Sequence, residues 1–193
     1  MLQDIERVLI SEEELREIVR DMGARISRDY EGKNLGRQIS EDFAGKEPIF
    51  VGVLKGCFIF MADLVRSITI PCRVDFMSIS SYGSGIKSTG VIKIDKDVSS
   101  DLTGYDVLIA EDILDSGLTL DFIMRMLSSR GANSVTICTL LDKPERRKAE
   151  VYAKYIGRKT PDEFVVGYGL DYAERYRNLP FVGILKPSVY GGK

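Results

Sequence analysis

Residues 107–119 read VLIAEDILDSGLT, and this stretch decides the fold class. It opens with four apolar residues in a row, a pattern typical of a short strand buried on both faces of a parallel sheet. Similar apolar runs occupy 49–54 and 134–141. Residues with helical spacing follow the runs at 49–54 and 107–110. This alternation predicts an α/β fold with a parallel sheet. Since no repeat, low-complexity tract or linker interrupts the chain, we expect a single domain over 1–193.

The first helix is expected to begin at Ser11, which forms a capping box with Glu14. Gly32 and Gly36 should break or bend the chain after it, and a second helical stretch should reach Phe43. The other expected elements are a loop over 111–117, a helix from there to about Arg130, a mobile loop over 81–90, and strands at 74–80, 91–95, 164–166 and 182–185.

The chain has 193 residues, of which 27 are basic and 29 acidic. Its net charge of −2 gives no general attraction to nucleic acid or to an anionic membrane, so neither partner is expected. The N-terminus lacks the basic start and long apolar run of a signal peptide, and Asp63 interrupts an apolar stretch too short to span a bilayer. Three widely spaced cysteines are typical of reduced thiols, which predicts a cytoplasmic protein.

The chain contains no histidine. This excludes nucleophilic catalysis of the Ser-His-Asp and Cys-His kinds, and it excludes most zinc sites. Acid–base chemistry must therefore rest on Asp, Glu, Lys or Tyr. A metal ion would be a hard cation on carboxylates.

The second half of VLIAEDILDSGLT combines carboxylates with a seat for an anion. Glu111, Asp112 and Asp115 lie at the carboxyl end of the predicted strand, where open parallel sheets bind their ligands. Residues 116–119 lead into a helix, whose N–H groups and dipole suit a phosphate. A ribose phosphate would satisfy both, because its hydroxyls can donate to carboxylates while its phosphate occupies the helix end.

The chain resembles the type I phosphoribosyltransferases, and in detail the hypoxanthine-guanine phosphoribosyltransferase family. Five motifs in the family's order carry this resemblance: VLKG at 53–56, SYGSG at 81–85, EDILDSGLT at 111–119, LLDKPERR at 140–147, and FVVGYGLDYAERYRNLP at 164–180. The resemblance implies the type I phosphoribosyltransferase fold, with a central, mostly parallel sheet flanked by helices and a small hood built from terminal segments.

The resemblance also implies a role for each position of the central motif. Glu111 and Asp112 would hold the ribose hydroxyls, partly through Mg²⁺, and Asp115 would be the general base that manages the purine proton. Ser116, Gly117, Leu118 and Thr119, with the backbone from Asp115 onward, would bind the 5-phosphate. Leu118 departs from the family pattern, in which this position is often polar or basic.

The other motifs are expected to complete the site. By resemblance, Lys55, Gly56 and Arg177 would bind pyrophosphate, with a cis peptide bond before Lys55, and a loop that opens with Ser81 and Tyr82 would close over the reactants. Lys143 would donate to the 6-oxo group of the purine, Phe164 would stack on the ring, and the Val165 backbone would bond its edge. Asp171 would reach a second Mg²⁺ and help to define the pocket near the purine 2-position.

The implied reaction joins a purine base to phosphoribosyl pyrophosphate and yields a purine nucleotide and pyrophosphate. Transferases that prefer xanthine or another 6-oxopurine stay open as alternatives, because they differ in contacts that one sequence reports poorly. A regulatory protein that binds RNA or DNA would need a basic face, and a purely structural domain would leave the three carboxylates unexplained. Relatives are commonly dimers or tetramers, so a homodimer or homotetramer is expected.

Overall fold

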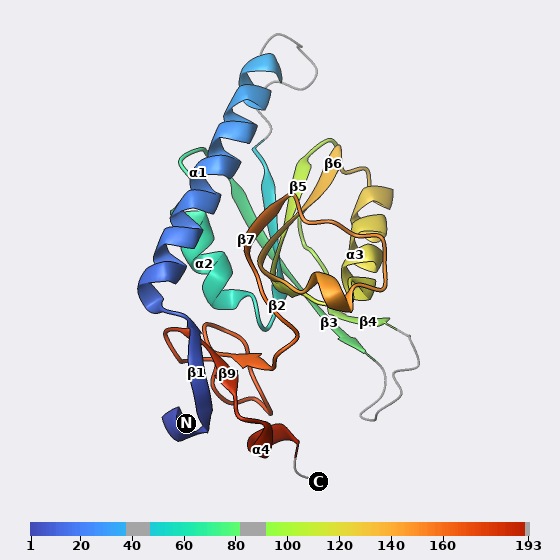
Figure 1. The fold of residues 1–193 in the computed structure, drawn as a ribbon. Coiled ribbons are helices and arrows are strands. Elements are labelled where there is room, and N and C mark those ends of the chain that lie inside the picture. The colour runs from blue at the N-terminus through green and yellow to red at the C-terminus, as the bar shows by residue number, and fades with distance from the viewer. Residues whose placement is uncertain (38–46, 82–91, 192–193) are drawn as a thin grey trace.

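The computed structural model describes residues 1–37, 47–81 and 92–191. A six-stranded sheet with the order β4-β3-β2-β5-β6-β7 forms the centre (Figure 1). Its β3 and β4 pair antiparallel, whereas the other neighbouring pairs are parallel. The predicted α/β fold with a mostly parallel sheet is therefore confirmed. The strands are β2 (Ile49–Leu54), β3 (Arg73–Ser81), β4 (Ile92–Lys96), β5 (Asp106–Leu114), β6 (Ser134–Asp142) and β7 (Tyr155–Lys159).

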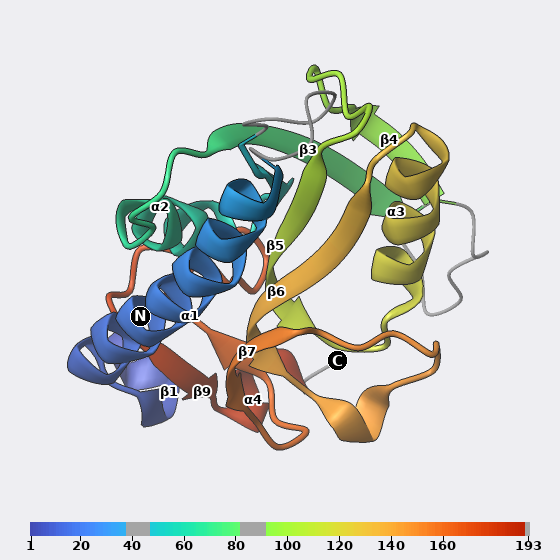
Figure 2. The same cartoon turned by 90° about the horizontal axis from the view of Figure 1, so that it is seen from above.

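Helices cover both faces of this sheet (Figure 2). On one face lie α1 (Glu12–Arg37) and α2 (Phe58–Arg66), and on the other lies α3 (Leu118–Ser129). Successive strand residues point to opposite faces. Leu108 accordingly packs with the α1 and α2 side chains, while Ile109 packs with those of α3. Burial on both faces explains why the strands read as continuous apolar runs.

A small antiparallel sheet with the order β1-β9-β8 lies beyond the carboxyl ends of the parallel strands (Figure 1). It brings the two ends of the chain together, since Ile5 lies opposite Leu185. This sheet is the hood expected from terminal segments. Its strands are β1 (Ile5–Ile10), β8 (Val165–Val166) and β9 (Val182–Leu185). The short helix η1 (Leu2–Asp4) precedes β1, and α4 (Pro187–Tyr190) follows β9. Another short helix, η2 (Pro144–Arg146), follows β6 of the larger sheet.

Three expectations about the elements were wrong. Helix α1 runs without a break to Arg37, so Gly32 and Gly36 do not interrupt it, and the stretch expected to reach residue 43 lies outside the described residues. Strand β5 continues to Leu114, because its end pairs with β6, so residues 111–114 are strand and not loop. Strands β1 and β7 were missed, since neither has the apolar run of a central strand.

Among the described residues, no helix is both long and apolar enough to cross a membrane.

Candidate active site

The loop between β5 and α3 lines a cavity of about 290 Å³. Gly117 begins α3 with a φ of 80°, a left-handed conformation that glycine adopts without strain. The N-terminal N–H groups of a helix have no partner within the helix, so they are available to an anion. The lining residues are Glu111, Ile113, Leu114, Asp115, Ser116, Gly117, Thr119 and Leu120. Leu118, by contrast, is exposed and does not line the cavity.

Glu111 and Asp112 serve two different cavities because they are neighbours in a strand, where successive side chains point to opposite sides. Glu111 lines the smaller cavity, whereas Asp112 lines a second one of about 480 Å³. This second cavity also contains Lys55, Arg177 and Asp171. The structure thus brings the predicted pyrophosphate residues to one side of β5 and the predicted phosphate loop to the other.

Both carboxyl groups are held in an environment that disfavours their charge. Burial raises the pKa of Asp112 to about 6, against the hydrogen bond of 2.8 Å that Oδ1 accepts from the Ile113 N–H. Burial, together with the neighbouring charge of Asp112, raises the pKa of Glu111 well above its usual range. Glu111 Oε2 is buried and accepts no hydrogen bond from the described residues. These carboxylates are therefore poised to accept a cation or hydroxyl donors.

The cations of the larger cavity are held by nearby carboxylates. Lys55 Nζ lies 3.2 Å from Glu174 Oε1, and Arg177 Nη2 lies 2.8 Å from Asp171 Oδ1. The peptide bond before Lys55 is cis, as expected. Gly56 permits the closest approach in the site, because a Cβ there would fall 1.6 Å from Asp112 Oδ2.

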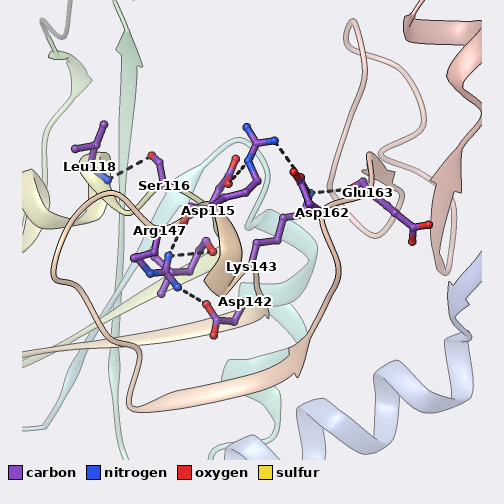
Figure 3. A network of polar contacts seen from close by, with 10 residues as sticks. Asp115, Ser116, Leu118, Asp142, Lys143, Arg147, Asp162 and Glu163 are labelled. Carbon is purple, nitrogen blue, oxygen red and sulfur yellow. Dashed lines mark hydrogen bonds and ion pairs between the residues drawn. The ribbon is translucent and has the colours of Figure 1, made fainter.

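Three of the predicted purine residues, Lys143, Phe164 and Val165, line neither of these two cavities, whereas the fourth, Asp171, lines the larger one. Lys143 is buried and its Nζ donates to the Glu163 carbonyl at 2.6 Å (Figure 3). Burial lowers the pKa of this ammonium, against the attraction of the Asp115 and Asp162 carboxylates. Phe164 stacks on Tyr190 with ring centroids 4.9 Å apart. Val165 begins the short strand β8 next to it.

Comparison with known proteins agrees with this geometry. A phosphoribosyl transferase domain family matches residues 17–173. A hypoxanthine-guanine phosphoribosyltransferase from Staphylococcus aureus (strain Mu50 / ATCC 700699) is 50% identical over 190 residues, covering 98% of this chain and 99% of that protein. The chain belongs to the hypoxanthine-guanine phosphoribosyltransferase family.

Solved structures of phosphoribosyltransferases share the architecture. A crystal structure of a hypoxanthine phosphoribosyltransferase from Staphylococcus aureus has a TM-score of 0.88 and 49% identity, covering 100% of this chain and 97% of that one. A mutant of the Trypanosoma cruzi hypoxanthine phosphoribosyltransferase, in a ternary substrates complex, has a TM-score of 0.87 and 37% identity, covering 97% of this chain and 99% of that one. The type I phosphoribosyltransferase fold expected from the motifs is therefore confirmed.

Three residues of this phosphoribosyltransferase site escaped the sequence analysis. Arg146 Nε lies 2.7 Å from Asp115 Oδ1 as an ion pair, and its Nη1 donates to Asp162 at 3.0 Å. Arg147 binds the backbone of the same loop (Figure 3). Glu174 contacts both Lys55 and Arg177. The two arginines end the motif LLDKPERR, three and four residues after Lys143, and this position was the available signal, although tandem arginines alone are more often solvated.

The predicted magnesium residues do not form a ready-made ligand set. Within the described part of the chain, no three Asp, Glu, His or Cys side chains converge on a point that could hold a metal ion. Glu111 still offers its unbonded Oε2, and Asp112 and Asp171 line one cavity. This arrangement fits Mg²⁺, which commonly takes one or two protein carboxylates and completes its shell with water and substrate phosphates.

The loop expected to close over the reactants is only partly described. Ser81 is the last residue of β3, and Tyr82 lies outside the described residues.

Proposed function

We propose that this chain transfers the 5-phosphoribosyl group from phosphoribosyl pyrophosphate to hypoxanthine, guanine or both, forming the nucleotides IMP or GMP and pyrophosphate. The observation that carries the proposal is the pair of cavities on the two sides of β5. One ends at a helix N-terminus that suits a 5-phosphate. The other contains Lys55 and Arg177, which suit the leaving pyrophosphate. Membership of a purine phosphoribosyltransferase family supports the same reaction.

Residues of the two cavities would contact different parts of phosphoribosyl pyrophosphate. The carboxylates of Glu111 and Asp112 accept hydrogen bonds from its hydroxyls, and residues 115–119 bind its 5-phosphate. Lys55 and Arg177 stabilise the negative charge that develops on pyrophosphate as the bond to the anomeric carbon breaks. Bound Mg²⁺ would supply further neutralisation of that charge, with one ion at Glu111 and Asp112 and a second at Asp171.

The residues expected to bind the purine would orient the base, and Asp115 would accept its proton. Lys143 has donors only, so its ammonium favours the 6-oxo group of hypoxanthine or guanine over the 6-amino group of adenine. Phe164 offers a ring for stacking, and the Val165 backbone bonds the purine edge. Asp115 acts as the general base, since its carboxylate lies in the loop that lines the smaller cavity, where Arg146 Nε holds Oδ1 at 2.7 Å. Asp171 contributes near the purine 2-position.

The test is a turnover assay with phosphoribosyl pyrophosphate, Mg²⁺ and one base at a time: hypoxanthine, guanine, xanthine or adenine. We expect turnover with hypoxanthine or guanine. An absence of turnover with all four, or turnover with adenine alone, would contradict the proposal.

The Asp115→Asn variant tests the general base. We expect turnover to fall by about 10²–10⁴-fold while GMP still binds, because the amide keeps the shape but cannot take the proton. Asp21→Asn, which removes an exposed carboxylate on α1, is the control and should keep full turnover. Near-normal turnover of Asp115→Asn would remove Asp115 from the mechanism.

Two expectations about the cellular setting belong to the same proposal. Cys57, Cys72 and Cys138 are free, which supports a reducing compartment such as the cytoplasm. We also propose that the enzyme assembles as a homodimer or homotetramer, which sedimentation at several concentrations would test.

A further inference from the structure

Arg147 binds the backbone of the loop between β5 and α3. Its Nη1 donates to the Leu114 carbonyl at 3.2 Å and to the Asp115 carbonyl at 2.6 Å. Its Nη2 donates to the Asp142 carboxylate at the end of β6 (Figure 3). Both side chains of this ion pair are largely shielded from solvent. The guanidinium therefore links the end of β6 to the loop.

A third carbonyl of the loop faces the same way. The Ser116 carbonyl accepts hydrogen bonds from the backbone N–H groups of Lys148, at 2.8 Å, and Ala149, at 3.2 Å. The Leu114 carbonyl also accepts from the Lys143 N–H at 3.0 Å. Three consecutive carbonyls, at 114, 115 and 116, thus point toward the segment 143–149.

This arrangement determines where the N–H groups of the loop point. In a trans peptide the C=O and the following N–H point in opposite directions. Carbonyls held toward 143–149 therefore direct the N–H groups of Asp115, Ser116 and Gly117 away from that segment. Successive N–H groups that converge beside a left-handed residue form a concave seat for an anion. Gly117 is that residue, with a φ of 80°.

The stem of Arg147 also supports the left-handed turn. A Cβ on Gly117 would lie 3.1 Å from Arg147 Cδ, so the glycine backbone packs directly on this side chain. Arg147 thereby contacts the turn in two ways, through its guanidinium on the carbonyls and through its stem on Gly117.

We propose that Arg147 is a positioning residue for the ribose 5-phosphate. This proposal rests on the proposed function of the loop between β5 and α3. Arg147 acts through the carbonyls of Leu114 and Asp115, which orient the N–H groups that bind the phosphate. A lysine could keep the charge beside Asp142. It could not reproduce the planar fork that donates to the carboxylate and the carbonyls together.

The proposal is tested by measuring two ligands on each variant. We expect Arg147→Lys and Arg147→Met to weaken binding of ribose 5-phosphate by about tenfold or more. Pyrophosphate should bind within about twofold of its wild-type affinity, because Lys55 and Arg177 line the cavity on the other side of β5. Isothermal titration calorimetry on the full chain gives both constants.

Controls separate positioning from a general loss of structure. Arg130→Lys perturbs another arginine–aspartate pair, with Asp97 at 2.7 Å, on the surface, and it should leave both affinities unchanged. Asp142→Asn loosens the guanidinium without removing it and should give a smaller loss of the same kind. If Arg147→Met does not fold, Arg147→Lys and Asp142→Asn carry the test.

Two results would overturn the positioning role. One is an Arg147→Lys protein with unchanged ribose 5-phosphate affinity, and the other is an equal loss for both ligands. Failure of the wild-type protein to bind ribose 5-phosphate would instead contradict the proposed function.

Discussion

Replacing Asp112 by asparagine should stabilise the protein while it inactivates the enzyme. Burial raises the pKa of the Asp112 carboxyl from its ordinary value of 3.8 to about 6. Each pKa unit corresponds to about 1.4 kcal/mol, so the ionised carboxylate costs the folded state about 3 kcal/mol above pH 6. The amide removes that charge, and its oxygen can still accept from the Ile113 N–H. Its new donor, if it finds no partner, costs about 1 kcal/mol or more.

The net gain in the free energy of unfolding at pH 7.5 is therefore about 2 kcal/mol. For a chain of this size it corresponds to roughly 4–8 °C in melting temperature. The sign of the pH dependence follows from the raised pKa. The folded state binds the Asp112 proton more tightly than the unfolded state, so the contribution of Asp112 to wild-type stability falls as pH rises from about 4 to 6 and then levels off. The advantage of Asp112→Asn should accordingly shrink by about 1.5 kcal/mol at pH 5.

The assay is urea denaturation of both proteins at pH 7.5 and pH 5, with EDTA present because a bound divalent cation would stabilise the ionised carboxylate. Asp97→Asn is the control of opposite sign. The hydrogen bond from Arg130 lowers the pKa of Asp97, so that substitution should destabilise the protein at pH 7.5. Two results would refute this reasoning. One is an Asp112→Asn protein no more stable than wild type at pH 7.5, and the other is a difference in the free energy of unfolding that does not change with pH.

Two further substitutions test contacts around the site. Glu174→Gln removes a carboxylate that lies 3.2 Å from Lys55 and 3.4 Å from Arg177, so pyrophosphate should inhibit at about two- to fivefold lower concentration. Weaker inhibition than in wild type would mean that Glu174 holds Lys55 and Arg177 in position for pyrophosphate and does not compete with pyrophosphate for them. Tyr190→Ala removes the ring stacked on Phe164, and the KM for the purine should rise by roughly two- to tenfold while the KM for phosphoribosyl pyrophosphate stays constant. Tyr190→Phe should keep the wild-type KM for the purine. A raised KM in this variant would mean that the Tyr190 hydroxyl, and not the stacked ring, supports purine binding.

Local patterns in the sequence determined much of the fold. Continuous apolar runs predicted the central strands because burial on both faces requires apolar side chains at every position. The capping box was equally reliable, since it uses contacts three residues apart. In the structure, Ser11 and Glu14 exchange hydrogen bonds of 2.8 and 3.2 Å. Gly117 was also predicted to lie in the turn before a helix, and its left-handed φ confirms this.

Tertiary structure alone decided the features that depend on distant partners. Strand β5 extends to Leu114 because β6 pairs with its end, and this pairing sends Glu111 and Asp112 to different cavities. The hood forms because β1 finds β9 at the other end of the chain, and no short segment encodes that contact. The sequence assigned no role to Arg146 or Arg147, but the turn after β6 brings both into contact with the loop between β5 and α3. The sequence by itself predicted which residues could bind a ribose phosphate, whereas long-range pairing and packing decided on which side of β5 each one lies.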